Sequence, residues 1–278
     1  GQHWLPKRLL TEAVGWLAAR EGGALTRAAI RWFIGRYRVD MSEALDPDPA
    51  AYPSFNAFFT RALKPDARPL AQHASWICPV DGAVSQCGAI EQGLILQAKG
   101  HRYRCEDLLG GDTQLASELE DGAFATLYLS PRDYHRIHMP AGGRLLAMRY
   151  VPGALYSVNP LTARNIEGLF ARNERVVCVF EMQEGAARGA RFAMVLVGAT
   201  IVGSMATTWH GVVNPPRLSG IREWSYGETG PVLAQGEEMG RFLLGSTVVL
   251  LVPRGLASAW PTWESGRSVR LGEAMSGF

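Results

Sequence analysis

The hydrophobic pattern of the chain changes near Trp76, and this change constrains the fold more than any other feature. From that point on, short runs rich in Val, Ile, Leu, Phe and Tyr alternate with Gly, Pro and Asp-Gly. Such runs are typical of β-strands joined by turns. They cover residues 93–98, 124–129, 144–151, 176–182, 192–197 and 247–253. The pattern predicts a mainly antiparallel β-core that is barrel-like or sandwich-like.

The part of the chain before this change has a helical pattern instead. Five apolar residues recur at spacings of three and four and form one stripe, namely Leu25, Ala29, Trp32, Phe33 and Tyr37. A further short helix is expected around residues 55–62. The sequence therefore predicts an α+β fold, with N-terminal amphipathic helices on the β-core. The Asp-Pro repeat at 46–49 indicates a boundary, which divides the chain into residues 1–45 and 46–278.

Charge is distributed unevenly along the chain. The net charge is only +2, yet residues 1–39 hold seven Lys/Arg and two Asp/Glu, a balance of +5, so the remainder carries −3. A nucleic-acid-binding protein should place its basic residues across the folded domain, so this function is not favoured. Trp4, Trp16 and Trp32 lie among these basic residues, as in helices that contact a membrane surface. The alternative is an amphipathic helix packed on its own domain.

Several other classes of protein lack support. Residues 192–216 carry no formal charge and are long enough to span a membrane, but Gly, Ser, Thr and a closing Pro-Pro favour buried strands with a turn. No secretory signal is evident. The four cysteines form no CxxC, so neither a zinc knuckle nor a dense disulfide framework is indicated, and a reducing, cytoplasmic setting is the simpler expectation. Nucleotide-binding glycine motifs are also missing.

Gly245 and Ser246 interrupt an apolar run at residues 242–252. A glycine in a strand often marks only a β-bulge or a close backbone approach. The alternative is that Gly245 lets its carbonyl be attacked by the Ser246 hydroxyl. A serine hydroxyl is a weak nucleophile unless a histidine takes its proton and a carboxylate orients that histidine.

Candidates for both partners are present. His135 and His138 lie three residues apart in a segment bounded by prolines, and Asp81 lies in the segment 79–83. Asp-Gly is also a common turn dipeptide, and this dipeptide by itself favours a turn role for Asp81 over a catalytic one. An HxxH pair could bind a metal, but no third ligand is evident and no metal site is predicted.

Seven motifs in this order resemble the phosphatidylserine decarboxylase family, in its bacterial membrane-associated branch. They cover about residues 76–250, and the LGST signature of the family is intact. The motifs are PVDGAVSQ at 79–86, ILQAKGHRY at 95–103, YLSPRDYHRIHMP at 128–140, VPGALYSVN at 151–159, LFARNERVVCVF at 169–180, VLVGATIVGS at 195–204 and GEEMGRFLLGST at 236–247.

The resemblance implies a self-cleaving enzyme. Asp81, His138 and Ser246 would form the cleavage triad, with His138 as base and Asp81 as its orienting residue, and His135 would face the substrate. Cleavage between Gly245 and Ser246 would give a β chain of residues 1–245 and an α chain of residues 246–278. Ser246 would become a covalent pyruvoyl group, the electron sink that forms a Schiff base with the substrate amine.

The resemblance also implies the substrate and the partners. Phosphatidylserine would be converted to phosphatidylethanolamine and CO2 in phospholipid biosynthesis, at an anionic membrane surface. The enzyme would be peripheral to the cell membrane on its cytoplasmic side, with residues 1–45 as the membrane-association segment. A homodimer of cleaved protomers is expected, with no nucleic-acid partner.

Three alternatives stay open at this stage. A serine hydrolase could use Asp81, His138 and Ser246 in an uncleaved chain, although GxSxG is missing. A β-rich, membrane-attached binding module would need no chemistry at Ser246. A pyruvoyl enzyme could also act on a small soluble amino acid, but the N-terminal helices argue against this.

Overall fold

The computed structural model describes residues 15–185, 187–199, 204–214, 217, 219–243, 247–257 and 260–275. Residues 15–19 are helical, and the helices that lie wholly within the described part of the chain are short, apart from α2. They are α2 (Gly23–Tyr37), α3 (Phe55–Phe59), α4 (Cys105–Leu108), α5 (Thr113–Glu118), α6 (Pro160–Ala163), α7 (Leu169–Arg172) and α8 (Arg254–Ala257), with 3-10 turns η1 (Pro49–Ala51), η2 (Pro65–Ala67) and η3 (Gly227–Thr229).

Within the described residues, nine strands form the main sheet, and all of their pairings are antiparallel. Their order is β11 (Arg222–Ser225), β6 (Gly143–Val151), β7 (Arg175–Met182), β8 (Arg191–Val197), β14 (Thr247–Val252), β4 (Ala123–Tyr128), β1 (Gly82–Ala89) and β15 (Ser268–Val269), with β12 (Val232–Leu233) also on β6. The sheet ends at β11 and β15, so it does not close into a barrel. The predicted strands and the α+β class are confirmed.

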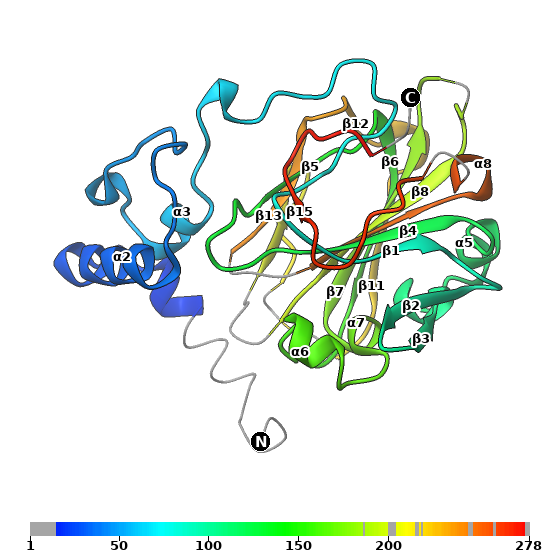
Figure 1. Ribbon diagram of the computed structural model, residues 1–278, viewed down its shortest axis with the longest axis horizontal. Coiled ribbons are helices and arrows are strands. Elements are labelled where there is room, and N and C mark those ends of the chain that lie inside the picture. Colours follow the sequence, from blue (N-terminus) through cyan, green and yellow to red (C-terminus); the bar gives the residue numbers. More distant parts are fainter. Residues whose placement is uncertain are drawn as a thin grey trace.

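A second, four-stranded sheet covers one face of the main sheet, as the course of β5 and β13 in Figure 1 illustrates. Its order is β10 (Gly211–Val212), β9 (Met205–Thr207), β13 (Glu238–Phe242) and β5 (Arg136–His138). The hairpin of β2 (Leu94–Ala98) and β3 (His101–Arg104) packs on the opposite face together with α4, α5 and α7. The core is therefore sandwich-like.

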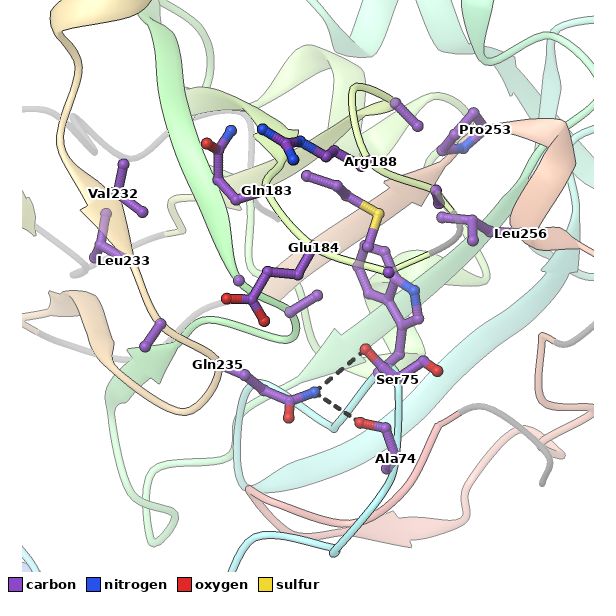
Figure 2. Close-up of a pocket in the computed structure, with 18 of the residues that line it drawn as sticks. Ala74, Ser75, Gln183, Glu184, Arg188, Val232, Leu233, Gln235, Pro253 and Leu256 are labelled. Atoms are coloured by element: carbon purple, nitrogen blue, oxygen red, sulfur yellow. Dashed lines mark hydrogen bonds between the residues drawn. The ribbon is translucent and has the colours of Figure 1, made fainter.

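A cavity of about 880 Å³ opens beside the connection between β7 and β8. Figure 2 shows Glu184 of that connection on the side of Gln235, whose side-chain amide donates to the carbonyls of Ala74 and Ser75 at 3.0 and 3.2 Å, while Arg188 extends toward Gln183. The same amide donates to the carbonyl of Pro140 at 3.0 Å. These bonds hold the loop before β13 against the segment that leads into β1.

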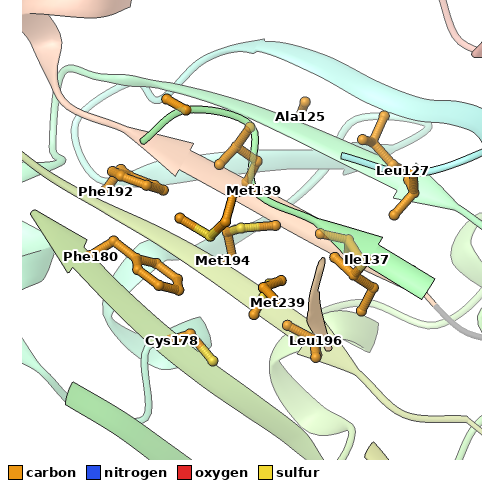
Figure 3. Packing of buried hydrophobic residues seen from close by; sticks show 14 of the residues in the cluster. Ala125, Leu127, Ile137, Met139, Cys178, Phe180, Phe192, Met194, Leu196 and Met239 are labelled. Carbon is orange, nitrogen blue, oxygen red and sulfur yellow. The ribbon is translucent and has the colours of Figure 1, made fainter. Parts of the chain in front are cut away.

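The central strand β14 contributes to both hydrophobic cores because its side chains alternate between the two faces of the sheet. Val248, Leu250 and Val252 point to the core beneath β5 and β13, while Val249 and Leu251 point to the core beneath α4 and α5. Figure 3 shows how Ile137 and Met239 of the second sheet meet Met194 and Leu196 of the main sheet. Burial on both faces explains why β14 is a continuous apolar run.

The N-terminal helix α2 has two different apolar faces, where the sequence indicated a single stripe. Ile30 and Phe33 are buried against α3, and the Phe33 ring meets that of Phe59 at 6.0 Å between centroids. Leu25 and Trp32 point away from the protein and are 83% and 64% exposed. The single stripe was therefore wrong, because Phe33 faces the protein while Leu25 and Trp32 face outward.

The helix α3 starts where it was expected but ends at Phe59, earlier than residue 62. The uncharged segment 192–216 includes β8, β9 and β10 and so contains strands, as predicted. Among the described residues, no helix combines the length and apolar character that a membrane crossing requires. The four cysteines are free thiols. The division of the chain at residue 45 stays a prediction.

Candidate active site

The histidine-bearing segment connects β4 to β6 and crosses the second sheet as β5. The turn that opens it is held by Asp133, whose carboxylate accepts from the backbone amide and the hydroxyl of Ser130 at 2.7 and 2.8 Å. Strand β5 then pairs with β13, with His138 opposite Glu238. The backbone amide of His138 donates to the carbonyl of Pro79 at 2.9 Å, which ties this strand to the segment that carries Asp81.

His138 is held in one tautomer by two neighbours. Its Nδ1 donates to the carbonyl of Gly236 at 2.8 Å, because a carbonyl can only accept. Its Nε2 therefore carries the lone pair and accepts from the hydroxyl of Tyr134 at 3.1 Å. Burial lowers the pKa of His138 below its ordinary value of 6.5. The imidazole is thus a neutral base at neutral pH, with Nε2 as the atom that takes a proton.

His135 is completely buried. Its Nδ1 donates to the carbonyl of Asp133 at 2.8 Å, and the ring of Phe59 lies 4.0 Å away between centroids. Burial and, to a smaller extent, the charge of Arg61 lower the pKa of His135 to about 3. Its Nε2 has no hydrogen-bond partner among the described residues. A buried polar atom without a partner is costly, so this nitrogen is a candidate for contact with a bound molecule.

Asp81 is buried but is not hydrogen-bonded to His138. Its carboxylate accepts from Nε of Arg68 at 2.8 Å and from the backbone amide of Leu271 at 2.9 Å. The other carboxylate of this cluster, Glu43, binds a second nitrogen of Arg68 at 2.8 Å. Direct orientation of His138 by Asp81 has no hydrogen bond to support it here, and this role stays a prediction. The charge of Asp81 is one of the smaller effects that oppose the lowering of the His138 pKa by burial.

Gly245 and Ser246 lie outside the described residues, but both flanks of this segment are described. At the end of β13, the backbone amide of Phe242 donates to the carbonyl of His135 at 3.0 Å. At the start of β14, Thr247 pairs with Tyr128 of β4 and with Val197 of β8. The chain on either side of the predicted cleavage bond is thus attached to the two ends of the segment 128–135.

Comparison with known proteins decides the family. A family model described as phosphatidylserine decarboxylase matches residues 55–276. The chain belongs to the phosphatidylserine decarboxylase family. A second model, described as PSD, matches residues 1–38.

Close relatives of the same family span nearly the whole chain. A phosphatidylserine decarboxylase proenzyme of Acidovorax ebreus (strain TPSY) is 63% identical over 275 residues, covering 99% of this chain and 95% of the relative. The protein of the same name from Polaromonas naphthalenivorans (strain CJ2) is 64% identical over 278 residues, covering 99% and 94%. That from Azoarcus sp. (strain BH72) is 64% identical over 274 residues, covering 99% and 93%.

Three side chains of this site were missed by the sequence reading of the family motifs. Phe59, Arg61 and Arg68 all lie before the first motif, in the stretch between the N-terminal helices and the β-core. They reach the site only because this stretch folds back against Asp81 and His135. Tyr134 and Gly236, which hold His138, do lie within the quoted motifs, but no spacing rule identifies them as its partners.

Proposed function

We propose that the chain decarboxylates phosphatidylserine to phosphatidylethanolamine and CO2 after cutting itself between Gly245 and Ser246. One observation carries the proposal beyond the family match. His138 is held as a neutral base, with its Nε2 lone pair directed away from Gly236, in the strand that pairs with the one leading to Gly245. Self-cleavage of a serine peptide bond needs a base in this form.

In the proposed cleavage, the Ser246 hydroxyl attacks the carbonyl of Gly245 and its proton passes to Nε2 of His138. The C–N bond between Gly245 and Ser246 breaks to give an ester, and the freed amine of Ser246 takes up this proton. Elimination of the Gly245 carboxylate then leaves dehydroalanine, whose hydrolysis gives the pyruvoyl group and ammonia. The Gly236 carbonyl keeps Nδ1 protonated, so the ring accepts the proton at the correct nitrogen. Tyr134 occupies Nε2 in the described structure, at 3.1 Å, and its hydroxyl has to yield this position to the serine. The negative charge of Asp81 favours the imidazolium that forms.

The residues around His135 fit a pyruvoyl group made from Ser246. Such a group supplies a carbonyl that draws electrons from the substrate when CO2 leaves. The buried Nε2 of His135 has no hydrogen-bond partner among the residues that the structure describes, and the low pKa of His135 keeps this nitrogen an acceptor at neutral pH. We propose that His135 accepts a hydrogen bond from the substrate at this nitrogen. A cationic imidazole is not needed for this role.

The outer face of the N-terminal helices supports a peripheral membrane location. Among the described residues of the N-terminal segment, Trp16, Leu17, Leu25 and Trp32 are large apolar side chains that are at least 60% exposed. The guanidinium of Arg20 lies 4.4 Å from the ring centre of Trp16, so aromatic and cationic groups occur together as in interfacial helices. We propose that this face contacts anionic lipid on the cytoplasmic side of the cell membrane, in a homodimer of cleaved protomers.

The experiment is intact mass under denaturing conditions, with the Ser246→Ala variant beside the wild type. The proposal expects two wild-type fragments, of residues 1–245 and 246–278, with the smaller one blocked by a ketone that reacts with hydroxylamine. Ser246→Ala stays a single 30.3 kDa chain, and the exposed Ser117→Ala control is cut like the wild type. A single chain in the wild type that labels with active-serine probes would support the serine hydrolase instead.

A further inference from the structure

A second cavity, of about 310 Å³, lies between the N-terminal part of the chain and the β-core. Its walls come from residues 38–43, 61–68, 81–82, 132–134 and 268–270. It therefore adjoins the segment of His135 and His138 on one side. On the other side it reaches Arg38, the residue that ends α2. Nothing in the proposed cleavage chemistry uses the basic residues of this cavity other than Arg68.

Arg61 lies in the wall of this cavity and is only 4% exposed. One of its terminal nitrogens donates to the carbonyl of Arg132 at 3.2 Å, and its guanidinium lies 5.5 Å from the ring centre of Phe58. Its Nε has no partner, and Arg61 forms no ion pair with any residue in the described part of the chain. A buried guanidinium nitrogen without a hydrogen-bond partner is unfavourable, and an anion that bonds to it removes this cost.

The carboxylates of the cavity are hydrogen-bonded to other residues, although the charges of Asp81, Asp133 and Asp40 act on Arg61 from a distance. Arg68 is held by Asp81 and Glu43, and Arg270 also binds Glu43. The carboxylate of Asp133 accepts from Ser130, and that of Asp40 accepts from Ser42. Arg38 and Arg132 are exposed at the mouth, and Nε of Arg132 lies 3.9 Å from the carboxylate of Asp133. The cavity therefore contains the buried guanidinium of Arg61 and the exposed guanidinium groups of Arg38 and Arg132.

We propose that this cavity binds the phosphodiester of the substrate lipid, with Arg61 at its base and Arg38 and Arg132 at its mouth. The inference rests on the proposed function and adds the headgroup site to it. The cavity lies between the candidate active site and the exposed apolar face of α2. On the inner side, Arg61 is close enough for its charge to act on His135. On the outer side, Arg38 directly follows α2, whose outer face is apolar. A lipid phosphate at the membrane surface would enter past Arg38.

The phosphate is a better ligand for Arg61 than the substrate carboxylate. The carboxylate loses its charge when it leaves as CO2, so an ion pair with Arg61 would stabilise the ground state and slow the reaction. The phosphodiester keeps its charge throughout, and its binding energy is the same in the ground state and the transition state. Such uniform binding lowers KM and leaves kcat unchanged.

The test compares Arg61→Gln and Arg61→Lys with the wild type, using phosphatidylserine in mixed detergent micelles. We expect Arg61→Gln to raise KM about 10- to 100-fold with kcat within about twofold, as for a lost charge-assisted hydrogen bond. Arg61→Lys should recover part of the loss. Arg188→Gln, an exposed arginine at the larger cavity, should change neither constant. A fall in kcat at unchanged KM would overturn the proposal.

A second measurement covers the case in which Arg61→Gln does not fold. Glycerophosphoglycerol, an anionic diester without amine or acyl chains, should raise the Tm of the wild type and should not raise that of Arg38→Gln/Arg132→Gln. An equal Tm rise in both proteins would contradict the site. Failure of the proposed function would be distinguishable from failure of this phosphate site, because the wild-type chain would then remain uncut.

Discussion

His135 and His138 lie in one segment, yet their imidazoles are prepared for different tasks. Both donate from Nδ1 to a backbone carbonyl, which leaves Nε2 as the acceptor in each. The difference is in what faces Nε2: a tyrosine hydroxyl at His138, and no partner within the described residues at His135. At His138, the Ser246 hydroxyl can replace the tyrosine hydroxyl at Nε2, as a base for serine requires. At His135, the buried Nε2 is available to a substrate that binds after cleavage.

The burial of His135 predicts a specific acid sensitivity. Its pKa is about 3 in the folded protein and 6.5 ordinarily, so below pH 6.5 the unfolded chain binds a proton that the folded one does not. The free energy of unfolding should therefore fall by about 1.4 kcal/mol per pH unit on acidification from this residue. His135→Gln should show a correspondingly flatter profile between pH 6.5 and 4.5 in denaturant titrations.

The exposed His73→Asn variant is the control for this prediction, because a histidine at the surface avoids the cost of burial. Its stability profile should follow that of the wild type. If His135→Gln has the same slope as the wild type, then His135 takes up a proton without unfolding and is not buried as described.

The sequence identified Asp81, His135 and His138 as candidates, because the proposed chemistry needs those residue types and they lie in the family motifs. It could not predict that Arg68 would hold Asp81 or that Phe59 would stack on His135. Both contacts depend on how residues 55–68 fold back on the core, and no periodicity encodes that path. Arg61 gave no signal in the sequence, since a lone arginine is ordinarily a surface residue.

At the scale of elements, α2 and α3 connect the outer surface to the site. Phe33 of α2 packs on Phe59 of α3, which in turn packs on His135. Deletion of residues 1–39 would therefore weaken vesicle binding but would also remove a support of His135. Substitutions on the outer face alone separate these two effects.

We expect the double variant Leu25→Ser/Trp32→Ser to bind anionic vesicles at least about tenfold more weakly, since each side chain loses burial in lipid. Self-cleavage should be unchanged, because neither side chain faces α3. The measurement is co-sedimentation with phosphatidylglycerol vesicles. Leu161→Ser on α6, which is 71% exposed, is the matched control and should bind normally. Equal binding by all three proteins would show that this face does not contact lipid.

The strands were the elements that the sequence predicted best, and the buried face of α2 was the feature that it predicted worst. Runs such as residues 176–182 and 192–197 became β7 and β8 almost without change, because burial on both faces demands a continuous apolar run. The face of α2 was mispredicted because spacing shows which residues share a side of a helix, but not which side the protein covers. The order of the strands in the sheet was not predictable, since it depends on long-range pairing.

For the molecule as a whole, the predicted cleavage leaves the smaller piece built into the core. Strand β14 pairs with β4 on one side and β8 on the other, and all of its residues are buried. Further along, β15 pairs with β1, and the amide of Met275 donates to the carbonyl of Trp76 at 2.8 Å. Residues 247–275 therefore complete the sheet of the larger piece, and covalent connection at Gly245-Ser246 is not needed to hold them.

This arrangement predicts that the two fragments elute together in native size-exclusion chromatography and separate only in denaturant. The cleaved protein should also refold differently from the Ser246→Ala precursor. Closing the connection between β13 and β14 is intramolecular in the precursor, whereas two cleaved chains must associate, so their refolding yield should rise with protein concentration. The yield of the precursor should be independent of concentration in the same dilute range. Separate elution of the fragments without denaturant would contradict the pairing of β14 with β4 and β8, because that pairing buries every side chain of the strand in the larger piece.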